Sequence, residues 1–188
     1  MEASFVALAK IAEADKEAIT TKYHADTFFR QYEKGLISDS SFRERFRKFT
    51  NESIEDDEID RAWNAMLVDL PINRINLVTK LRRDYRVMVL SNTNSIHVKR
   101  FNQMLYDVSG KNELSSFFDE VYFSHEINMR KPDAEIYEFV LAENNLRPEE
   151  TLFLDDNKQN LEAAEQLGIK TSHVDHPDRL FDIFKEWI

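Results

Sequence analysis

Short apolar segments alternate with helical patterns from about residue 72 onward, and this alternation restricts the possible folds most strongly. Segments rich in β-branched and aromatic residues predict strands at 85–90, 120–123, 152–154 and 170–174. Helices that separate successive strands connect them in parallel through right-handed crossovers. The sequence therefore predicts an α/β fold, in which helices cover a parallel sheet.

Residues 1 to about 70 carry helical periodicity instead, with aromatic residues on one face of each predicted helix. A helix end is predicted at Gly35, helix starts are predicted near 38–41 and 53–55, and the helical region is predicted to end by Pro71. We predict two domains, a helical one over 1–70 and the α/β one over 71–188. The aromatics favour a helical core, although a pocket is an alternative for a smaller set: His24, Phe28, Phe29, Gln31 and Tyr32.

An acidic turn follows the predicted strand at 152–154, because Asp155 and Asp156 come directly after Leu154 and precede a helical pattern. Two adjacent carboxylates at the end of a buried strand repel each other, so a positive partner is expected. A divalent cation with oxygen ligands, Mg²⁺ first, is one such partner. Capping of the following helix by the aspartates is an equally weighted interpretation.

Three clusters of polar residues stand where an α/β fold places the carboxyl ends of its strands, at one edge of the sheet. They are Ser91-Asn92-Thr93, Lys131 and Asp155-Asp156. In open parallel sheets, ligands bind beyond the carboxyl ends of the strands. Hydroxyl and amide donors, a fixed cation and a metal-binding carboxylate are the groups needed to hold a phosphate and stabilise its transfer. Each cluster also has a structural interpretation, as a helix cap or a solvated lysine.

Charge and composition disfavour several classes of partner. The formal net charge of −10 disfavours nucleic acid and anionic membranes. Cysteine is absent, which excludes disulfides and thiol chemistry, and no stretch has the length of a membrane span or the pattern of a secretory signal. We expect a cytoplasmic protein that binds no nucleic acid and no membrane; the net charge leaves a small phosphorylated metabolite open as its partner, because local charge decides such binding.

Three segments resemble motifs of the haloacid dehalogenase-like (HAD) hydrolases. Residues 89–94 (Val-Leu-Ser-Asn-Thr-Asn), 129–137 (Met-Arg-Lys-Pro-Asp-Ala-Glu-Ile-Tyr) and 152–160 (Leu-Phe-Leu-Asp-Asp-Asn-Lys-Gln-Asn) are similar to the second, third and fourth motifs of that family. In order and spacing they resemble the sugar-phosphate phosphatase branch that includes bacterial α-D-glucose-1-phosphate phosphatases. The resemblance implies that residues 1–70 are a helical cap over a Rossmann-like HAD core formed by residues 71–188.

The resemblance also implies roles for individual residues. Ser91 and Asn92 would contact the phosphoryl group of a sugar phosphate, and Lys131 would neutralise it and orient the nucleophile. Asp156 would bind Mg²⁺, while Asp155 beside it would fix the geometry through Lys131 or metal-bound water. The implied reaction is Mg²⁺-dependent hydrolysis of a phosphate monoester.

The family's first motif, an apolar strand that ends in Asp-x-Asp and supplies the nucleophile, has no counterpart in this sequence. By resemblance that strand lies centrally, between the strands that end at Ser91 and Asp155. Its loss would expose several core side chains at about 1.5–3 kcal/mol each, which rivals a domain stability of roughly 5–15 kcal/mol. We therefore expect an N-terminally incomplete and inactive version of a longer phosphatase, lacking on the order of 20 residues.

Other interpretations remain. A non-catalytic member of the family would keep the fold as a binding or scaffolding module without its nucleophile. A two-component receiver also combines acidic residues, a hydroxyl and a lysine, but its acidic pair comes first in the chain. Dehalogenation would not need the second acidic residue. The histidines at 97, 125, 173 and 176 lack ligand spacing and are expected at the surface or in loops.

Overall fold

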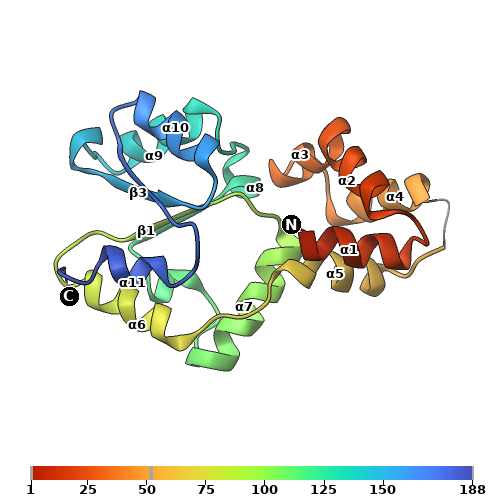
Figure 1. Cartoon of the computed structure of the whole chain (residues 1–188), viewed down its shortest axis with the longest axis horizontal. Helices are drawn as coiled ribbons and strands as arrows, with labels where there is room; N and C mark the ends of the chain where they lie inside the picture. Colours follow the sequence, from red (N-terminus) through yellow and green to blue (C-terminus); the bar gives the residue numbers. More distant parts are fainter. Residues whose placement is uncertain (1, 51–52, 188) are drawn as a thin grey trace.

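The computed structural model of the protein describes residues 2–50 and 53–187. The side chains of His24 and Phe49 lie outside this description, and with them the interpretation of His24 as a pocket residue. Figure 1 shows a helical part built from the first helices of the chain, beside an α/β part in which helices lie on both sides of short strands. No helix within these residues is long and apolar enough to cross a membrane.

The helical part has the predicted helix end at Gly35 and the predicted helix starts near 38–41 and 53–55, although its last α-helix ends at Trp63 and not near Pro71. Its elements are α1 (Glu2–Ile11), α2 (Lys16–Ala25), α3 (Thr27–Glu33), α4 (Asp39–Thr50), α5 (Asp56–Trp63) and the 3₁₀ turn η1 (Asn64–Met66). After α3, Gly35 adopts a φ of 67°, which suits a residue without a Cβ. The hydroxyl of Ser38 accepts a hydrogen bond from the Ser41 N–H at 3.2 Å as α4 begins. Glu55 and Glu58 form a capping box around the start of α5.

Buried aromatic residues fill the centre of the helical part. The ring of Phe29 lies 5.7 Å from that of Trp63 and 6.0 Å from that of Phe42. Tyr32 stacks on Phe42 at 4.2 Å. Such pairs stabilise a core beyond the area they bury. The predicted helical core is confirmed, and the pocket alternative is wrong for Phe28, Phe29 and Tyr32, each of which is at most 2% exposed.

The α/β part contains strands and helices in alternation, as predicted. In chain order its elements are α6 (Ile72–Leu81), β1 (Met88–Ser91), α7 (Ser95–Ser109), η2 (Leu114–Ser116), β2 (Glu120–Phe123), α8 (Ser124–Ile127), α9 (Ala134–Glu143), η3 (Pro148–Glu150), β3 (Leu152–Asp155), α10 (Lys158–Gln166), β4 (Lys170–His173) and α11 (Arg179–Ile183). The first strand begins three residues later than the pattern at 85–90 predicts. The Tyr85 N–H donates to the Leu81 carbonyl at the end of α6 at 2.9 Å, and the Val87 N–H donates to the carboxylate of Asp119 at 2.7 Å, so neither N–H pairs with β2.

The strands form two parallel pairs rather than one continuous sheet. β1 pairs with β2, with Ser91 opposite Phe123, and β3 pairs with β4, with Asp155 opposite His173. Among the described residues, no strand lies between β1 and β3 or joins them. The mixed α/β architecture with parallel strands is therefore as predicted, and within the described residues the position between β1 and β3 holds no strand.

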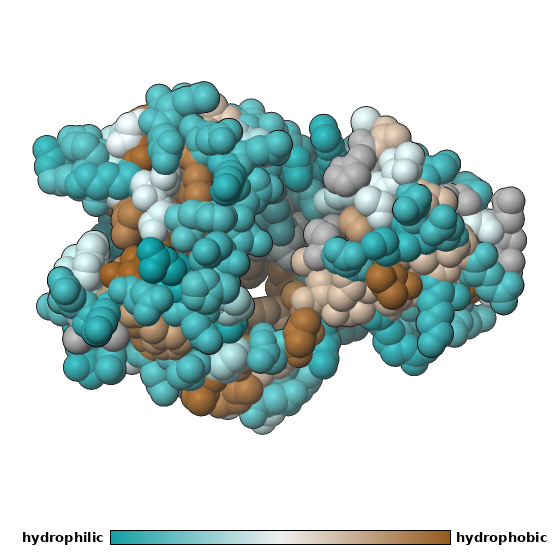
Figure 2. Space-filling view, viewed as in Figure 1, coloured by the Kyte–Doolittle hydropathy of each residue, from teal (hydrophilic) through white to brown (hydrophobic). Residues whose placement is uncertain are grey.

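Apolar cavities mark this gap between β1 and β3. One, of about 540 Å³, is lined by residues of both strands together with α6, α7 and α11. The other, of about 170 Å³, is lined by both strands together with α9. Figure 2 shows hydrophobic surface in the region where Figure 1 places the strands. Concave spaces lined mostly by apolar side chains are where ligands and other apolar groups bind.

The aromatic core of the helical part extends to one residue of the α/β part. That core runs from Phe5 to Trp63 and includes Ile96 of α7. Two separate cores, one around Ile136 and one around Leu77, lie in the later part of the chain. The division at residue 70 stays a prediction.

Candidate functional site

Lys131 is the centre of a polar cluster at the carboxyl ends of β1 and β3. Although it is a lysine, it is only 7% exposed. Its ammonium donates to the carbonyl oxygen of Leu90 and to Oδ2 of Asp155, each at 2.7 Å. It also lies 5.2 Å from the centroid of the Phe153 ring. Because an ammonium has three N–H groups, one remains for a further partner, and the interpretation of Lys131 as a solvated lysine is wrong.

Asn92 holds the loop that carries Lys131. Its side-chain Nδ2 donates to the Lys131 carbonyl at 2.8 Å, and its Oδ1 accepts from the Lys131 N–H, also at 2.8 Å. This reciprocal pair satisfies the main chain of Lys131 on both sides. The cap of α7 is a different residue, Asn94, whose Oδ1 accepts from the His97 N–H at 3.0 Å. The side chain of Asn92 is thus occupied in fixing the position of the lysine.

Asp155 forms an ion pair with Lys131, and both of its carboxylate oxygens accept hydrogen bonds. Oδ2 faces the lysine, while Oδ1 accepts from the Asn157 N–H at 2.8 Å and from Nδ2 of Asn160 at 2.9 Å. Asn157, not an aspartate, caps α10 by accepting from the Gln159 N–H. Capping therefore does not account for the acidic pair. The positive partner that the sequence predicts for Asp155 is Lys131.

Asp156 differs sharply from its neighbour. The residue is exposed, and within the described part of the chain its carboxylate has no hydrogen-bond or ion-pair partner. Only its main-chain oxygen is engaged, at 3.1 Å from Nε2 of His173. A free carboxylate next to a buried, neutralised one is suited to binding a cation from solution.

Ser91 ends β1 one residue before Asn92. It lines the larger cavity together with Asn92 and Thr93. The structure thus joins Asn92, Lys131 and Asp155 by direct hydrogen bonds. Ser91 and Asp156 are adjacent to this group in the chain, without a direct bond to Lys131.

Comparison with known proteins places this cluster in a family. The model of the haloacid dehalogenase-like hydrolases matches residues 77–174, just over half of the chain. The chain belongs to the haloacid dehalogenase-like hydrolases. All of the predicted site residues lie inside the matched range, so the motif resemblance is confirmed for the family.

Relatives of this HAD hydrolase include phosphatases. A D-ribitol-5-phosphate phosphatase of Bacteroides thetaiotaomicron is 28% identical over 165 residues, which are 88% of this chain and 80% of that protein. A HAD family enzyme of the same organism, solved in complex with magnesium and inorganic phosphate, is 36% identical with a TM-score of 0.80. The alignment covers 91% of this chain and 84% of the enzyme.

Another solved structure superposes on nearly the whole of this chain. A structure described as a predicted HAD-like family hydrolase of Porphyromonas gingivalis is 28% identical and superposes with a TM-score of 0.87. That superposition covers 99% of this chain and 89% of the other. The HAD fold therefore includes the helical part as well as the strands.

The donor set of this HAD hydrolase fits Mg²⁺ in part. In proteins Mg²⁺ is commonly held by one or two carboxylates, water and substrate phosphate. Asp156 offers one free carboxylate, and the Asp155 carboxylate beside it is already neutralised by Lys131. No group of three acidic or histidine side chains is found in the residues that the structure describes. The remaining ligands would therefore be water, phosphate oxygens or a group from outside these residues.

Sequence reasoning missed Ser124, which joins the helical part to the site loops. Its hydroxyl donates to the carbonyl of Glu33 at 2.6 Å and accepts from the Thr93 N–H at 2.9 Å. A signal was present, because Ser124 directly follows the strand β2 just as Ser91 stands at the end of β1. The pairing of Glu33 with Arg130 was also missed, and no local pattern indicates it.

His97 corrects the expectation that the histidines lie at the surface or in loops. It is 6% exposed, and its ring stacks on Trp63 at 5.2 Å. Nδ1 lies 2.9 Å from Oδ1 of Asn64. Burial lowers the pKa of His97 to about 4, so the ring is neutral near pH 7.

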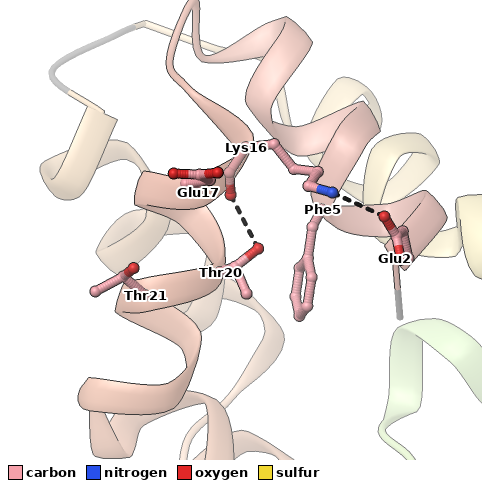
Figure 3. A pocket seen from close by; sticks show the side chains of 6 residues that line it. All are labelled: Glu2, Phe5, Lys16, Glu17, Thr20 and Thr21. Carbon is pink, nitrogen blue, oxygen red and sulfur yellow. Dashed lines mark hydrogen bonds and ion pairs between the residues drawn. The ribbon is translucent and has the colours of Figure 1, made fainter.

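A second hollow lies between α1 and α2, away from the Lys131 cluster. It has a volume of about 510 Å³ and is lined by six residues, shown in Figure 3: Glu2, Phe5, Lys16, Glu17, Thr20 and Thr21. Lys16 and Glu2 form an exposed ion pair at 2.7 Å across it. Glu17 also lines the hollow, but exposed pairs such as Lys16 with Glu2 contribute little, so the functional site is assigned to the Lys131 cluster instead.

Proposed function

We propose that this HAD hydrolase is a Mg²⁺-dependent phosphatase of small phosphorylated metabolites, and of sugar phosphates in particular. Phosphoryl transfer needs mainly positioning and charge neutralisation. The observation that carries the proposal is the buried ammonium of Lys131, held by Leu90 and Asp155 with one N–H group left. A cation fixed in this way is already oriented for an incoming anion and needs no rearrangement to receive it.

The other site residues take complementary roles in this proposal. Ser91 contacts the phosphoryl oxygens through its hydroxyl. Asn92 acts through Lys131, whose main chain it fixes on both sides. Asp156 holds the metal, and Asp155 keeps Lys131 in place. A bound Mg²⁺ would neutralise phosphoryl charge and polarise the leaving oxygen.

The attacking group in this proposal is an aspartate on a strand that occupies the gap between β1 and β3. Asp155 cannot attack, because both of its oxygens accept hydrogen bonds, and Asp156 cannot attack while it holds the metal. The aspartate would bond to phosphorus and release the sugar alkoxide, which takes up a proton. Water would then hydrolyse the aspartyl-phosphate and release inorganic phosphate.

Relatives support this assignment. One acts, by its name, on D-ribitol 5-phosphate, and another has been solved with magnesium and inorganic phosphate. The alternative is a HAD module that binds phosphate without turnover. One observation favours it: among residues 2–50 and 53–187, no third acidic or histidine side chain joins Asp155 and Asp156 in a metal-binding group.

A panel assay tests the proposal. Phosphate release from sugar phosphates would be measured, with and without Mg²⁺, on protein translated from the longest in-frame reading frame that contains these residues. We expect Mg²⁺-dependent release, and a rate reduced about 100-fold or more by Asp156→Ala. Glu162→Ala, an exposed acidic residue of α10, serves as the matched control. Mg²⁺-dependent phosphate binding without any release would instead establish the non-catalytic module.

A further inference from the structure

The site loop, residues 91–95, runs from the last residue of β1 to the first residue of α7. We propose that the helical part holds this loop in the shape that receives phosphate, with Asp39 and Ser124 as the positioning residues. The inference rests on the proposed function, because that function assigns the loop to the phosphoryl group. Asp39 holds the end of the loop and Ser124 holds its middle, and neither touches the substrate.

Asp39 binds the end of the site loop. The hydroxyl of Ser95, the first residue of α7, donates to Oδ1 of Asp39 in the first turn of α4. The hydroxyl of Tyr32 donates to the same oxygen at 2.9 Å. Tyr32 is 2% exposed and stacks on Phe42, so Asp39 is held from inside the aromatic core. Hydrogen bonds to a carboxylate are among the stronger ones in proteins, so this contact fixes the position of Ser95.

The two residues after Ser95 also contact the helical part. Ile96 is 4% exposed and belongs to the aromatic core of that part. The ring of His97 stacks on Trp63 at 5.2 Å, and its Nδ1 lies 2.9 Å from Oδ1 of Asn64. The first turn of α7 therefore packs into the helical part. Because a helix is a rigid element, its start fixes where the preceding loop ends.

Ser124 holds the middle of the site loop. Its hydroxyl accepts from the Thr93 N–H at 2.9 Å and lies 3.1 Å from the Thr93 carbonyl oxygen. The same hydroxyl donates to the carbonyl of Glu33 in α3 at 2.6 Å. Ser124 is 0% exposed, so water cannot readily replace these bonds. The loop is thus attached to the helical part at two points, Thr93 and Ser95.

These attachments act on the side of the site that would bind phosphate. Ser91 begins the loop, and Asn92 fixes the main chain of Lys131. A displacement of such groups by about 1 Å can cost on the order of 100-fold in rate. Asp156 instead follows β3, where Asp155 is held by Lys131 and by bonds within its own segment. Release of the loop should therefore weaken phosphate binding more than metal binding.

Phosphate and metal affinities test the inference on protein translated from the longest in-frame reading frame that contains these residues. Calorimetry would measure the binding of inorganic phosphate in excess Mg²⁺, and of Mg²⁺ alone. Asp39→Ala and Ser124→Ala should each weaken phosphate binding about 5–10-fold and change the Mg²⁺ affinity by less than about twofold. Asp39→Asn keeps the accepting oxygen and should restore most of the phosphate affinity. Asp57→Ala, at an exposed position in the first turn of α5, is the matched control.

A double variant and hydrogen exchange show whether the loop itself transmits the effect. Ser95→Ala added to Asp39→Ala should weaken phosphate binding by no more than about a further twofold, because both changes remove one contact. Amide exchange at 93–98 should become faster in Asp39→Ala and in Ser124→Ala. Exchange at 155–160 should stay unchanged in both variants.

Three results would overturn the inference: unchanged phosphate affinity in both variants, equal losses of phosphate and Mg²⁺ affinity, or phosphate binding by Asp39→Asn as weak as that of Asp39→Ala. Weakened phosphate binding in the variants of a protein that releases no phosphate from sugar phosphates would support the inference and contradict the phosphatase assignment. If the unsubstituted protein binds no phosphate, the proposed function is wrong and hydrogen exchange decides. Faster exchange at 93–98 in the variants would then support positioning of the loop, and unchanged exchange would overturn it.

Discussion

The guanidinium of Arg130 lies 3.0 Å from the carboxylate of Glu33, although 97 residues separate them in the chain. Glu33 ends α3 in the helical part and is 7% exposed, while Arg130 immediately precedes Lys131. The hydroxyl of Tyr23 donates to the other oxygen of Glu33 at 3.2 Å. A partly buried charge pair therefore connects the helical part to the loop that carries the proposed catalytic lysine.

Replacement of Glu33 should loosen this connection. Glu33→Gln keeps the shape of the side chain but removes its charge, so we expect a loss of about 1–3 kcal/mol in the free energy of unfolding. Urea denaturation measures the loss. Glu138→Gln, at an exposed position of α9, is the control and should change stability by less than about 0.5 kcal/mol. Equal effects of the two changes would show that the pair contributes nothing.

Gly35 should be less tolerant of a side chain than Gly110, although both have positive φ values of 67° and 69°. A Cβ at Gly35 would lie 2.0 Å from the carbonyl oxygen of His125, whereas a Cβ at Gly110 would meet nothing within 4 Å. Gly110→Ala should cost about 1 kcal/mol from backbone strain alone. Gly35→Ala should cost clearly more, with faster hydrogen exchange in α3 and α8. Equal costs in urea denaturation would contradict the close packing of α3 against α8.

Lys131 and Asp155 should show strong energetic coupling. Lys131→Met leaves the buried carboxylate without its cation, so we expect a loss of about 3–5 kcal/mol. Asp155→Asn in the same chain removes the unpaired charge and should restore part of the loss. A double-mutant cycle by urea denaturation should therefore give a coupling of about 1–3 kcal/mol. Additivity within about 0.5 kcal/mol would show that the pair at 2.7 Å is energetically independent.

His97 should make stability fall as the pH is lowered below its ordinary pKa. The folded-state pKa is about 4, below the unfolded value of about 6.5. The unfolded chain therefore takes up the proton first, and the contribution present above about pH 6.5 is lost progressively toward pH 4. Between about pH 7 and pH 5, the loss should be about 2 kcal/mol.

The His97→Phe variant checks this pH dependence. It keeps an aromatic ring next to Trp63, where His97 stacks at 5.2 Å, and removes the titrating group. In this variant, the difference in unfolding free energy between pH 7 and pH 5 should be smaller by about 2 kcal/mol. His176→Gln, an exposed histidine, is the matched control and should leave the difference unchanged. An unaltered pH dependence in His97→Phe would mean that other groups cause it.

The helix ends and the strand-end clusters illustrate what local patterns can predict. Gly35, Ser38 and Glu55 mark helix ends in the structure because capping depends on residues a few positions apart. Pairs such as Glu33 with Arg130, or Asn92 with Lys131, lie far apart in the chain, so no local pattern predicts them. The burial of His97 depends in the same way on Trp63, from a different helix.

By itself, the sequence determined the alternation of strands and helices, the helical first part, the family, and the three polar segments of the site. These follow from periodicity and from motifs of neighbouring residues. Only the tertiary structure decided that Lys131 neutralises Asp155 and leaves Asp156 free. It alone decided that the two faces of the gap between β1 and β3 differ in volume. Such features arise from the packing of distant elements against each other, which fixes distances that no stretch of sequence contains.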